Sequence, residues 1–389
     1  MKRKSILLVL CIGMVLTSCK NIKTLNDSDV KNEKSQNKTV MEIQDKGYDL
    51  PIDEKKKKEV VNDCEENMEA IRDIYSEFNG MQEADQNIAR QMMDRMKEII
   101  KQNGNPVRGS DHYSVMENYQ KMEMFLNAAR QEEKDNVILY EIDIDGGITR
   151  KEYTYDGENM FVMSAKMLWN DDTEPMLTYI SLSKIKEWKY TEYGNFCYEV
   201  CVPEPPEVTE IVDGSCIIRV RPLNEECLEY SEKYVGPLGY QGNNLLCSNW
   251  NIENMQDLDY NGIFEYLYNM KYGKKFSNET GVAGVTADEF ESVIMTYLPV
   301  TAEELKEWAV YDEQSNTYAW QRLGCGNYAP THFGLSLPEV IEIKHNEDGT
   351  VVLTINAVCD SVVCNDAVIT HELTMKIQDD GTIQYVGNR

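Results

Sequence analysis

The feature that most limits the fold of this chain is a change of hydrophobic period near Val137. Before this point, apolar residues recur three and four positions apart in segments that start near Val61, Ile88 and Val115, which is the period of a helix. From residue 137 to 220, β-branched and aromatic runs are separated by Asp-Gly dipeptides, which favour hairpin turns. The pattern predicts helices followed by an antiparallel sheet.

The same order returns in the C-terminal part of the chain. A short helix is expected near Asp257–Met270, and capping boxes at Thr286 and Thr301 predict two further helix starts. The tail Val340–Val386 is strand-like, with hairpin turns at two Asp-Gly pairs. Segregated helices and hairpins predict an α+β fold. A helix packed into a curved antiparallel sheet, as in nuclear-transport-factor-2-like or cystatin-like domains, is the architectural analogy for each half, and it carries no function.

The N-terminus has the organisation of an export signal. Lys2–Lys4 are positive, and the following stretch Ile6–Leu16 is mostly apolar but too short to span a hydrocarbon core of about 30 Å. It ends in Leu16-Thr17-Ser18-Cys19, which resembles the lipobox of bacterial lipoproteins. The resemblance implies cleavage before Cys19 and a diacylglycerol on its sulfur, and two acyl chains anchor a protein stably. The alternatives are an ordinary secretory signal with a chance cysteine, or an uncleaved anchor.

These signals divide the chain into four parts. We expect a signal peptide over residues 1–18, and the lipidated Cys19 with a disordered polar tether over residues 19–54. A domain of helices plus antiparallel sheet is expected over residues 55–257, and a C-terminal α+β domain over residues 258–389. The lipobox predicts that the protein lies on the outer face of the cytoplasmic membrane, held there by its lipid, in a Gram-positive-type bacterium.

The net charge of −28 excludes an electrostatic nucleic-acid binder as a first hypothesis, because phosphate backbones attract Lys and Arg. A solvated acidic surface explains such a charge without any function. The functional alternative is attraction to a basic partner or to cations.

No catalytic or metal-binding motif is complete. His371-Glu372 lacks the second histidine of a zinc protease, and Asp143-Ile144-Asp145-Gly146 fits a hairpin turn better than a calcium loop. Cys325 lies in a flexible Gly-Cys-Gly turn, but nothing else marks it as a nucleophile. Cys359 and Cys364 flank an expected hairpin loop and could form a disulfide. We therefore predict no catalytic residue, no metal and no cofactor.

Aromatic residues supply the one candidate binding surface. Trp188 and Tyr190 lie two apart in a strand-like run, so their rings share one face of the strand. We expect that one of them faces an open concavity and a ligand. The alternative is that both rings pack in the core of the sheet.

Several short runs resemble an uncharacterised family of clostridial lipoproteins that carry a domain of unknown function. They are Arg219–Leu223, Gly239–Asn244, Thr286–Trp320 and His371–Thr374. This resemblance implies location and fold but no catalytic residues. The function expected from the whole sequence is non-catalytic binding or scaffolding at the cell surface, with a wall polymer or another surface protein as partner and no nucleic acid. The alternative is a hydrolase acting on a wall or extracellular polymer.

Overall fold

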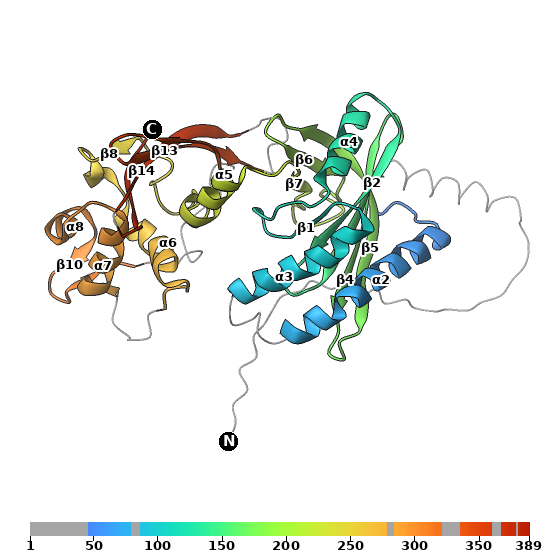
Figure 1. Ribbon diagram of the computed structural model, residues 1–389, viewed down its shortest axis with the longest axis horizontal. Coiled ribbons are helices and arrows are strands. Elements are labelled where there is room, and N and C mark those ends of the chain that lie inside the picture. Colours follow the sequence, from blue (N-terminus) through green and yellow to red (C-terminus); the bar gives the residue numbers. More distant parts are fainter. Residues whose placement is uncertain (1–45, 79–85, 278–283, 321–334, 360–366, 379) are drawn as a thin grey trace, which may run out of the picture. The chain divides into compact units, whose positions relative to one another are not determined.

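The fold is α+β, as predicted: N-terminal helices precede a strongly curled, mostly antiparallel sheet, and a further sheet follows in the C-terminal part (Figure 1). The structure is a computed structural model that describes residues 46–78, 86–277, 284–320, 335–359, 367–378 and 380–389. The expected signal peptide, Cys19, Cys325 and Cys364 lie outside the described residues. Residues Lys46–Arg389 form one unit of the chain.

Two long helices open this unit. Helix α2 (Glu54–Phe78) buries Val60, Cys64, Met68 and Ile71, which follow one another at intervals of three and four residues. Helix α3 (Gln86–Ile100) continues into a 3-10 turn, η1 (Lys101–Asn103), and packs its methionines into the same hydrophobic cluster. The periodicity of the sequence therefore predicted these helices, because burial follows the helical repeat.

The first sheet has seven strands in the order of the sequence. They are β1 (Val107–Gly109), β2 (Asp135–Ile142), β3 (Ile148–Tyr155), β4 (Met160–Trp169), β5 (Pro175–Tyr190), β6 (Asn195–Val200) and β7 (Ser215–Arg219). Strand β1 is parallel to β2, and the remaining neighbours are antiparallel. Gly146 and Gly157 take positive φ angles of 81° and 98° in the two predicted Asp-Gly turns, a conformation that favours glycine.

Alternating side chains give this sheet two covered faces. Tyr140, Ile148 and Ala165 pack against α2 and α3. Leu139, Tyr153 and other residues of opposite parity pack against helix α4 (Tyr119–Arg130). Because successive side chains of a strand point to opposite faces, one sheet serves both layers.

The C-terminal part is built around a second antiparallel sheet. Its strand order is β12 (Leu337–His345), β13 (Thr350–Val358), β14 (Ile369–Ile377), β15 (Ile383–Asn388) and β8 (Trp250–Asn251). A small sheet joins β10 (Tyr311–Asp312), β11 (Thr317–Tyr318) and β9 (Val285–Thr286). The helical elements are α5 (Glu225–Tyr230), the π-helical turn η2 (Ser231–Val235), η3 (Met255–Asp257), α6 (Tyr260–Tyr272), α7 (Ala287–Tyr297) and α8 (Ala302–Trp308).

The structure places residues 221–257 with the C-terminal core, although the sequence grouped them with the first domain. Cys227, Val235 and Trp250 belong to the C-terminal hydrophobic cluster, and β8 extends the second sheet at β15. Their periodicity is weak because the segment consists of short helical turns and a two-residue strand. The predicted capping box forms at Thr301, whereas Thr286 precedes its helix without a side-chain cap.

The tether predicted over residues 19–54 differs from the structure at its C-terminal end. Residues 46–52 lie along β5, where the Leu50 amide donates to the Leu182 carbonyl at 3.0 Å and the Lys184 amide donates to the Gly47 carbonyl at 2.6 Å. Ile52 packs against the cluster beneath α2 and α3. The polar composition did not predict that this segment packs on the sheet, because its contacts come mainly from backbone groups rather than from an apolar stripe.

Candidate functional site

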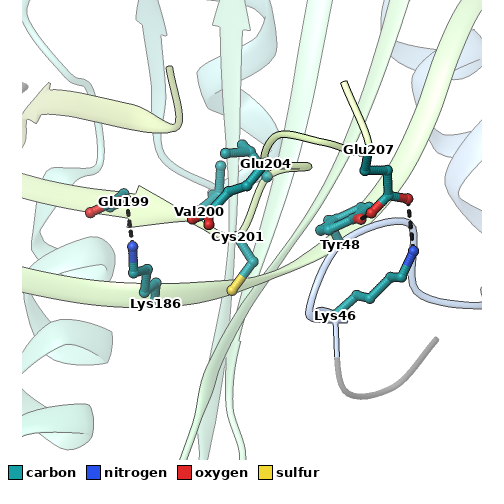
Figure 2. A pocket seen from close by; sticks show the side chains of 9 residues that line it. Lys46, Tyr48, Lys186, Glu199, Val200, Cys201, Glu204 and Glu207 are labelled. Atoms are coloured by element: carbon teal, nitrogen blue, oxygen red, sulfur yellow. Dashed lines mark hydrogen bonds and ion pairs between the residues drawn. The ribbon is translucent and has the colours of Figure 1, made fainter. Parts of the chain in front are cut away.

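A pocket of about 420 Å³ opens at the C-terminal end of β6, beside Lys186 of β5 and the first described residues of the chain. This volume falls within the usual range of small-molecule sites, about 300–1,000 Å³. Its walls come from three segments that are far apart in the sequence, and Figure 2 shows their side chains. The lining residues are Lys46, Tyr48, Lys186, Glu199, Val200, Cys201, Val202, Glu204 and Glu207.

Gly47 allows the N-terminal segment to reach this pocket. Its φ angle is +76°, and a Cβ at this position would lie 2.7 Å from Sγ of Cys201. A side chain would therefore be both strained and in collision with the thiol. The close approach holds Lys46 and Tyr48 against the loop that connects β6 to β7. The Asp213-Gly214 pair ends this loop and does not form the tight hairpin that the sequence predicted.

Two ion pairs line opposite sides of the pocket. Nζ of Lys46 lies 2.7 Å from Oε1 of Glu207, and the Tyr48 hydroxyl donates to the other oxygen of the same carboxylate. Nζ of Lys186 lies 3.0 Å from Oε1 of Glu199. Figure 2 shows Cys201 and Glu204 between the two pairs.

These contacts favour the charged forms of the paired groups. The hydrogen bond to Glu207 raises the pKa of Lys46, and the hydrogen bond to Glu199 raises the pKa of Lys186. Hydrogen bonds from Lys46 and then from Tyr48 lower the pKa of Glu207. A general acid or base works best with a pKa near the operating pH, and these shifts lead away from neutrality. The pairs are suited to holding charge in place.

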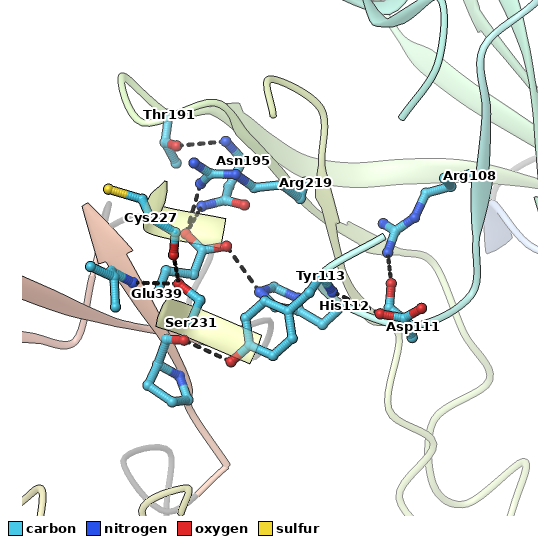
Figure 3. A network of polar contacts seen from close by, with 12 residues as sticks. Arg108, Asp111, His112, Tyr113, Thr191, Asn195, Arg219, Cys227, Ser231 and Glu339 are labelled. Atoms are coloured by element: carbon cyan, nitrogen blue, oxygen red, sulfur yellow. Dashed lines mark hydrogen bonds and ion pairs between the residues drawn. The ribbon is translucent and has the colours of Figure 1, made fainter. Parts of the chain in front are cut away.

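A second polar arrangement, buried rather than open, centres on Glu339 of β12 (Figure 3). Its side chain is 1% exposed. Nη1 of Arg219 donates to Oε2 of Glu339 at 2.7 Å, and Nδ2 of Asn195 donates to the same oxygen at 3.2 Å. Nε2 of His112 lies 2.9 Å from Oε1. The four side chains come from the segment after β1, from β6, from β7 and from β12.

The network fixes Glu339 as an anion. Burial alone would raise the pKa of this carboxyl, but the contacts with His112, Arg219 and Asn195 together lower the pKa below its ordinary value. An ionised carboxylate only accepts hydrogen bonds, so Nε2 of His112 must carry the hydrogen and donate it. Both carboxylate oxygens are engaged by the protein. This network therefore ties β12 to the first sheet.

The two predicted ligand-facing aromatics lie on the α4 side of the sheet. Tyr190 is 3% exposed, its hydroxyl donates to Glu123, and Arg130 lies over its ring with 5.1 Å between guanidinium carbon and ring centroid. Trp188 is half-buried and packs against the same hydrophobic cluster. The burial of Tyr190 matches the core alternative for this residue, and neither ring lines the pocket beside the C-terminal end of β6.

His371 is a structural residue. Nδ2 of Asn388 donates to backbone carbonyls, so its Oδ1 accepts from Nδ1 of His371 at 2.6 Å. Nε2 then accepts from the Tyr240 hydroxyl at 2.8 Å. Burial lowers the pKa of His371, which agrees with a neutral ring in this arrangement.

Other candidates from the sequence also have structural roles where the structure describes them. Asp143 and Gly146 form the turn between β2 and β3, with the Gly146 amide donating to the Asp143 carbonyl at 2.9 Å. No group of three or more potential ligands among the described residues is arranged to hold a metal ion. Within the same residues, no helix combines the length and apolar character needed to cross a membrane.

Sequence reasoning missed the residues of the pocket. No motif links the polar residues of the pocket. The pairing of β5 with β6 brings Lys186 to Glu199, and the N-terminal segment that lies on β5 brings Lys46 and Tyr48. The loop after β6 supplies Glu204 and Glu207. The one sequence feature that points to this segment is Gly47-Tyr48, a glycine and an aromatic residue in an otherwise polar stretch.

These features define an α+β protein with a charged surface pocket and a buried ionic link between its sheets. The chain belongs to a family of unknown function, DUF6070, whose model matches residues 57–389. The expected domain of unknown function is thereby confirmed, whereas the lipobox and the clostridial relatives stay predictions. Comparisons with curated proteins and with solved structures found no match.

Proposed function

We propose that this chain is a lipid-anchored, extracytoplasmic binding protein that does not catalyse a reaction. The observation that carries this proposal is the pocket of about 420 Å³ at the C-terminal end of β6. Its volume suits a small ligand or one unit of a polymer. The charged groups of its two ion pairs are held in their charged forms, as a recognition surface requires.

The location follows from the N-terminal sequence. The apolar run Ile6–Leu16 and the lipobox Leu16–Cys19 support export and attachment of diacylglycerol to Cys19. The pocket includes Lys46, so it lies close in sequence to this anchor. A binding site near the anchored end suits a ligand at the cell surface, either a wall polymer or another surface protein.

Metabolic labelling with a fatty acid tests the anchor. We expect label in the wild-type chain, no label in Cys19→Ser, and release of this variant from the membrane fraction. Unchanged labelling of Cys19→Ser would contradict the anchor.

A second measurement separates binding from catalysis. The purified protein is incubated with isolated wall material, and both retention on the solid and release of soluble fragments are followed. We expect saturable retention without fragments. Fragments whose release stops on replacement of one carboxylate would support the hydrolase alternative instead.

A further inference from the structure

The pocket already holds one ammonium group, that of Lys46. Its Nζ lies 2.7 Å from a carboxylate oxygen of Glu207 and 5.7 Å from the centroid of the Tyr48 ring. A carboxylate and an aromatic face are the groups with which proteins bind organic cations. One end of the pocket therefore shows a geometry that recognises a primary ammonium, occupied there by a side chain of the same chain.

The pocket lining has more carboxylates than ammonium groups, so one carboxylate has no lysine of the lining as an ion-pair partner. Glu207 pairs with Lys46, and Glu199 pairs with Lys186. Glu204 is exposed, and in the described part of the chain no cation lies within ion-pair distance of it. After the hydrogen bond from Glu199, the more distant charge of Glu204 also contributes to the raised pKa of Lys186. Figure 2 shows Glu204 between the two pairs. The net charge of −28 of the whole chain adds a long-range attraction for cations.

This distribution of charges in the pocket lining also disfavours the binding of an anionic ligand. Both ammonium groups of the lining are engaged by carboxylates, so an incoming phosphate or carboxylate would have to break an ion pair. It would also face the unpaired charge of Glu204. A cation meets neither obstacle.

The pocket lining also includes side chains that suit an alkyl chain. These are Val200, Cys201 and Val202. A ligand with an ammonium group on a short methylene stem would place the charge beside carboxylates and the stem against these side chains.

Building on the function proposed above, we propose that this pocket binds a primary alkylammonium group, with Glu204 as its counter-charge and Lys46 as a built-in competitor. A lysine side chain of a peptide and a free diamine both carry this group. Removal of the Lys46 charge frees Glu207 and the face of Tyr48, so ligand affinity should rise. An increase in affinity would be informative, because the loss of a lysine that merely supports the fold would lower the affinity.

Isothermal titration calorimetry on the full chain in detergent tests the proposal. The probes are Nα-acetyl-lysine amide, its Nε-acetylated form, which lacks the charge, and 1,5-diaminopentane, which has no peptide group. The variants are Glu204→Gln and Lys46→Met. Lys233→Met is the matched control, because Lys233 forms an exposed ion pair with Glu229 outside the pocket lining.

We expect the charged lysine probe to bind and its acetylated form to bind about tenfold more weakly or not at all. Glu204→Gln should weaken binding about tenfold, Lys46→Met should strengthen it severalfold, and Lys233→Met should leave it unchanged. Binding of 1,5-diaminopentane as tight as that of the lysine probe assigns recognition to the ammonium alone; weaker binding assigns part of it to the peptide group.

Three results would overturn the proposal: no binding of either ammonium probe, equal binding of the acetylated form, or weaker binding by Lys46→Met. None of them bears on the labelling of Cys19, or on whether wall material retains the wild-type chain without release of fragments. Failure of this assignment is therefore distinguishable from failure of the proposed function.

Discussion

Neutralising the buried carboxylate of Glu339 should destabilise the protein more than any change at a surface ion pair. Glu339→Gln keeps the shape of the side chain but removes the charge that faces Arg219 at 2.7 Å. Arg219 is 7% exposed, so its guanidinium would remain buried without a counter-charge. Breaking a buried pair in this way costs about 3–5 kcal/mol.

The assay is urea unfolding at pH 7, followed by tryptophan fluorescence. The midpoint of Glu339→Gln should fall while the slope stays near that of the wild type. Glu229→Gln is the control, because its pair with Lys233 is half-exposed on both sides and should contribute about 0–1 kcal/mol. The double variant Glu339→Gln, Arg219→Met should recover part of the loss, since it leaves no unpaired buried charge.

The effect should also depend on pH with a definite sign. The pKa of Glu339 in the folded protein lies below its ordinary value of about 4.3, so the unfolded chain takes up the proton first as the pH falls. The stabilisation is therefore complete at neutral pH and is lost as the pH falls from about 4.3 through the folded-state pKa. The difference between wild type and Glu339→Gln should shrink over this window. A loss below about 1 kcal/mol at pH 7 would refute the assigned role of the network.

Three further outcomes follow from the structure. A chain that begins at Asp53 should be about 2–3 kcal/mol less stable than one that begins at Lys46, because it loses two backbone hydrogen bonds to β5 and the packing of Ile52. Equal thermal midpoints of the two chains would show that residues 46–52 do not pack. Tyr190→Ala should cost about 3–5 kcal/mol in chemical denaturation, and more than Trp188→Ala, because Tyr190 is the more buried ring; the reverse order would contradict the described packing. Burial lowers the pKa of His371, so the wild type should lose stability as the pH falls from about 6.5, the pKa of histidine in the unfolded chain, to the folded-state pKa. Denaturation series at several pH values should show that His371→Gln lacks this part of the loss of stability in acid.

Local patterns predicted those parts of the fold that local physics determines. The stripe of α2, the Asp-Gly turns of the first sheet and the capping box at Thr301 each depend on residues a few positions apart. The α+β class follows from their order along the chain. These features can be predicted from a single sequence, because periodicity and turn chemistry act within one element.

The remaining features depend on pairings between distant segments. Strand β8 has two residues, and only its partner β15 gives it a place in a sheet. Glu339 is one acid among 67 Asp and Glu residues, and nothing near it in the sequence identifies Arg219 or His112 as its partners. The pocket likewise forms only when the segment around Gly47 lies on β5. Long-range contacts of this kind leave no periodic signal, so the sequence predicted neither polar site.

The central proposal is that the pocket at the C-terminal end of β6 binds a ligand at the cell surface. The most direct measurement is the equilibrium retention of the full chain on isolated wall material, for the wild type, Glu204→Gln and the control Lys233→Met. The account predicts saturable retention that Glu204→Gln weakens about tenfold and Lys233→Met leaves unchanged, with no soluble fragments released. Equal retention of all three proteins, or release of fragments by the wild type, would contradict it.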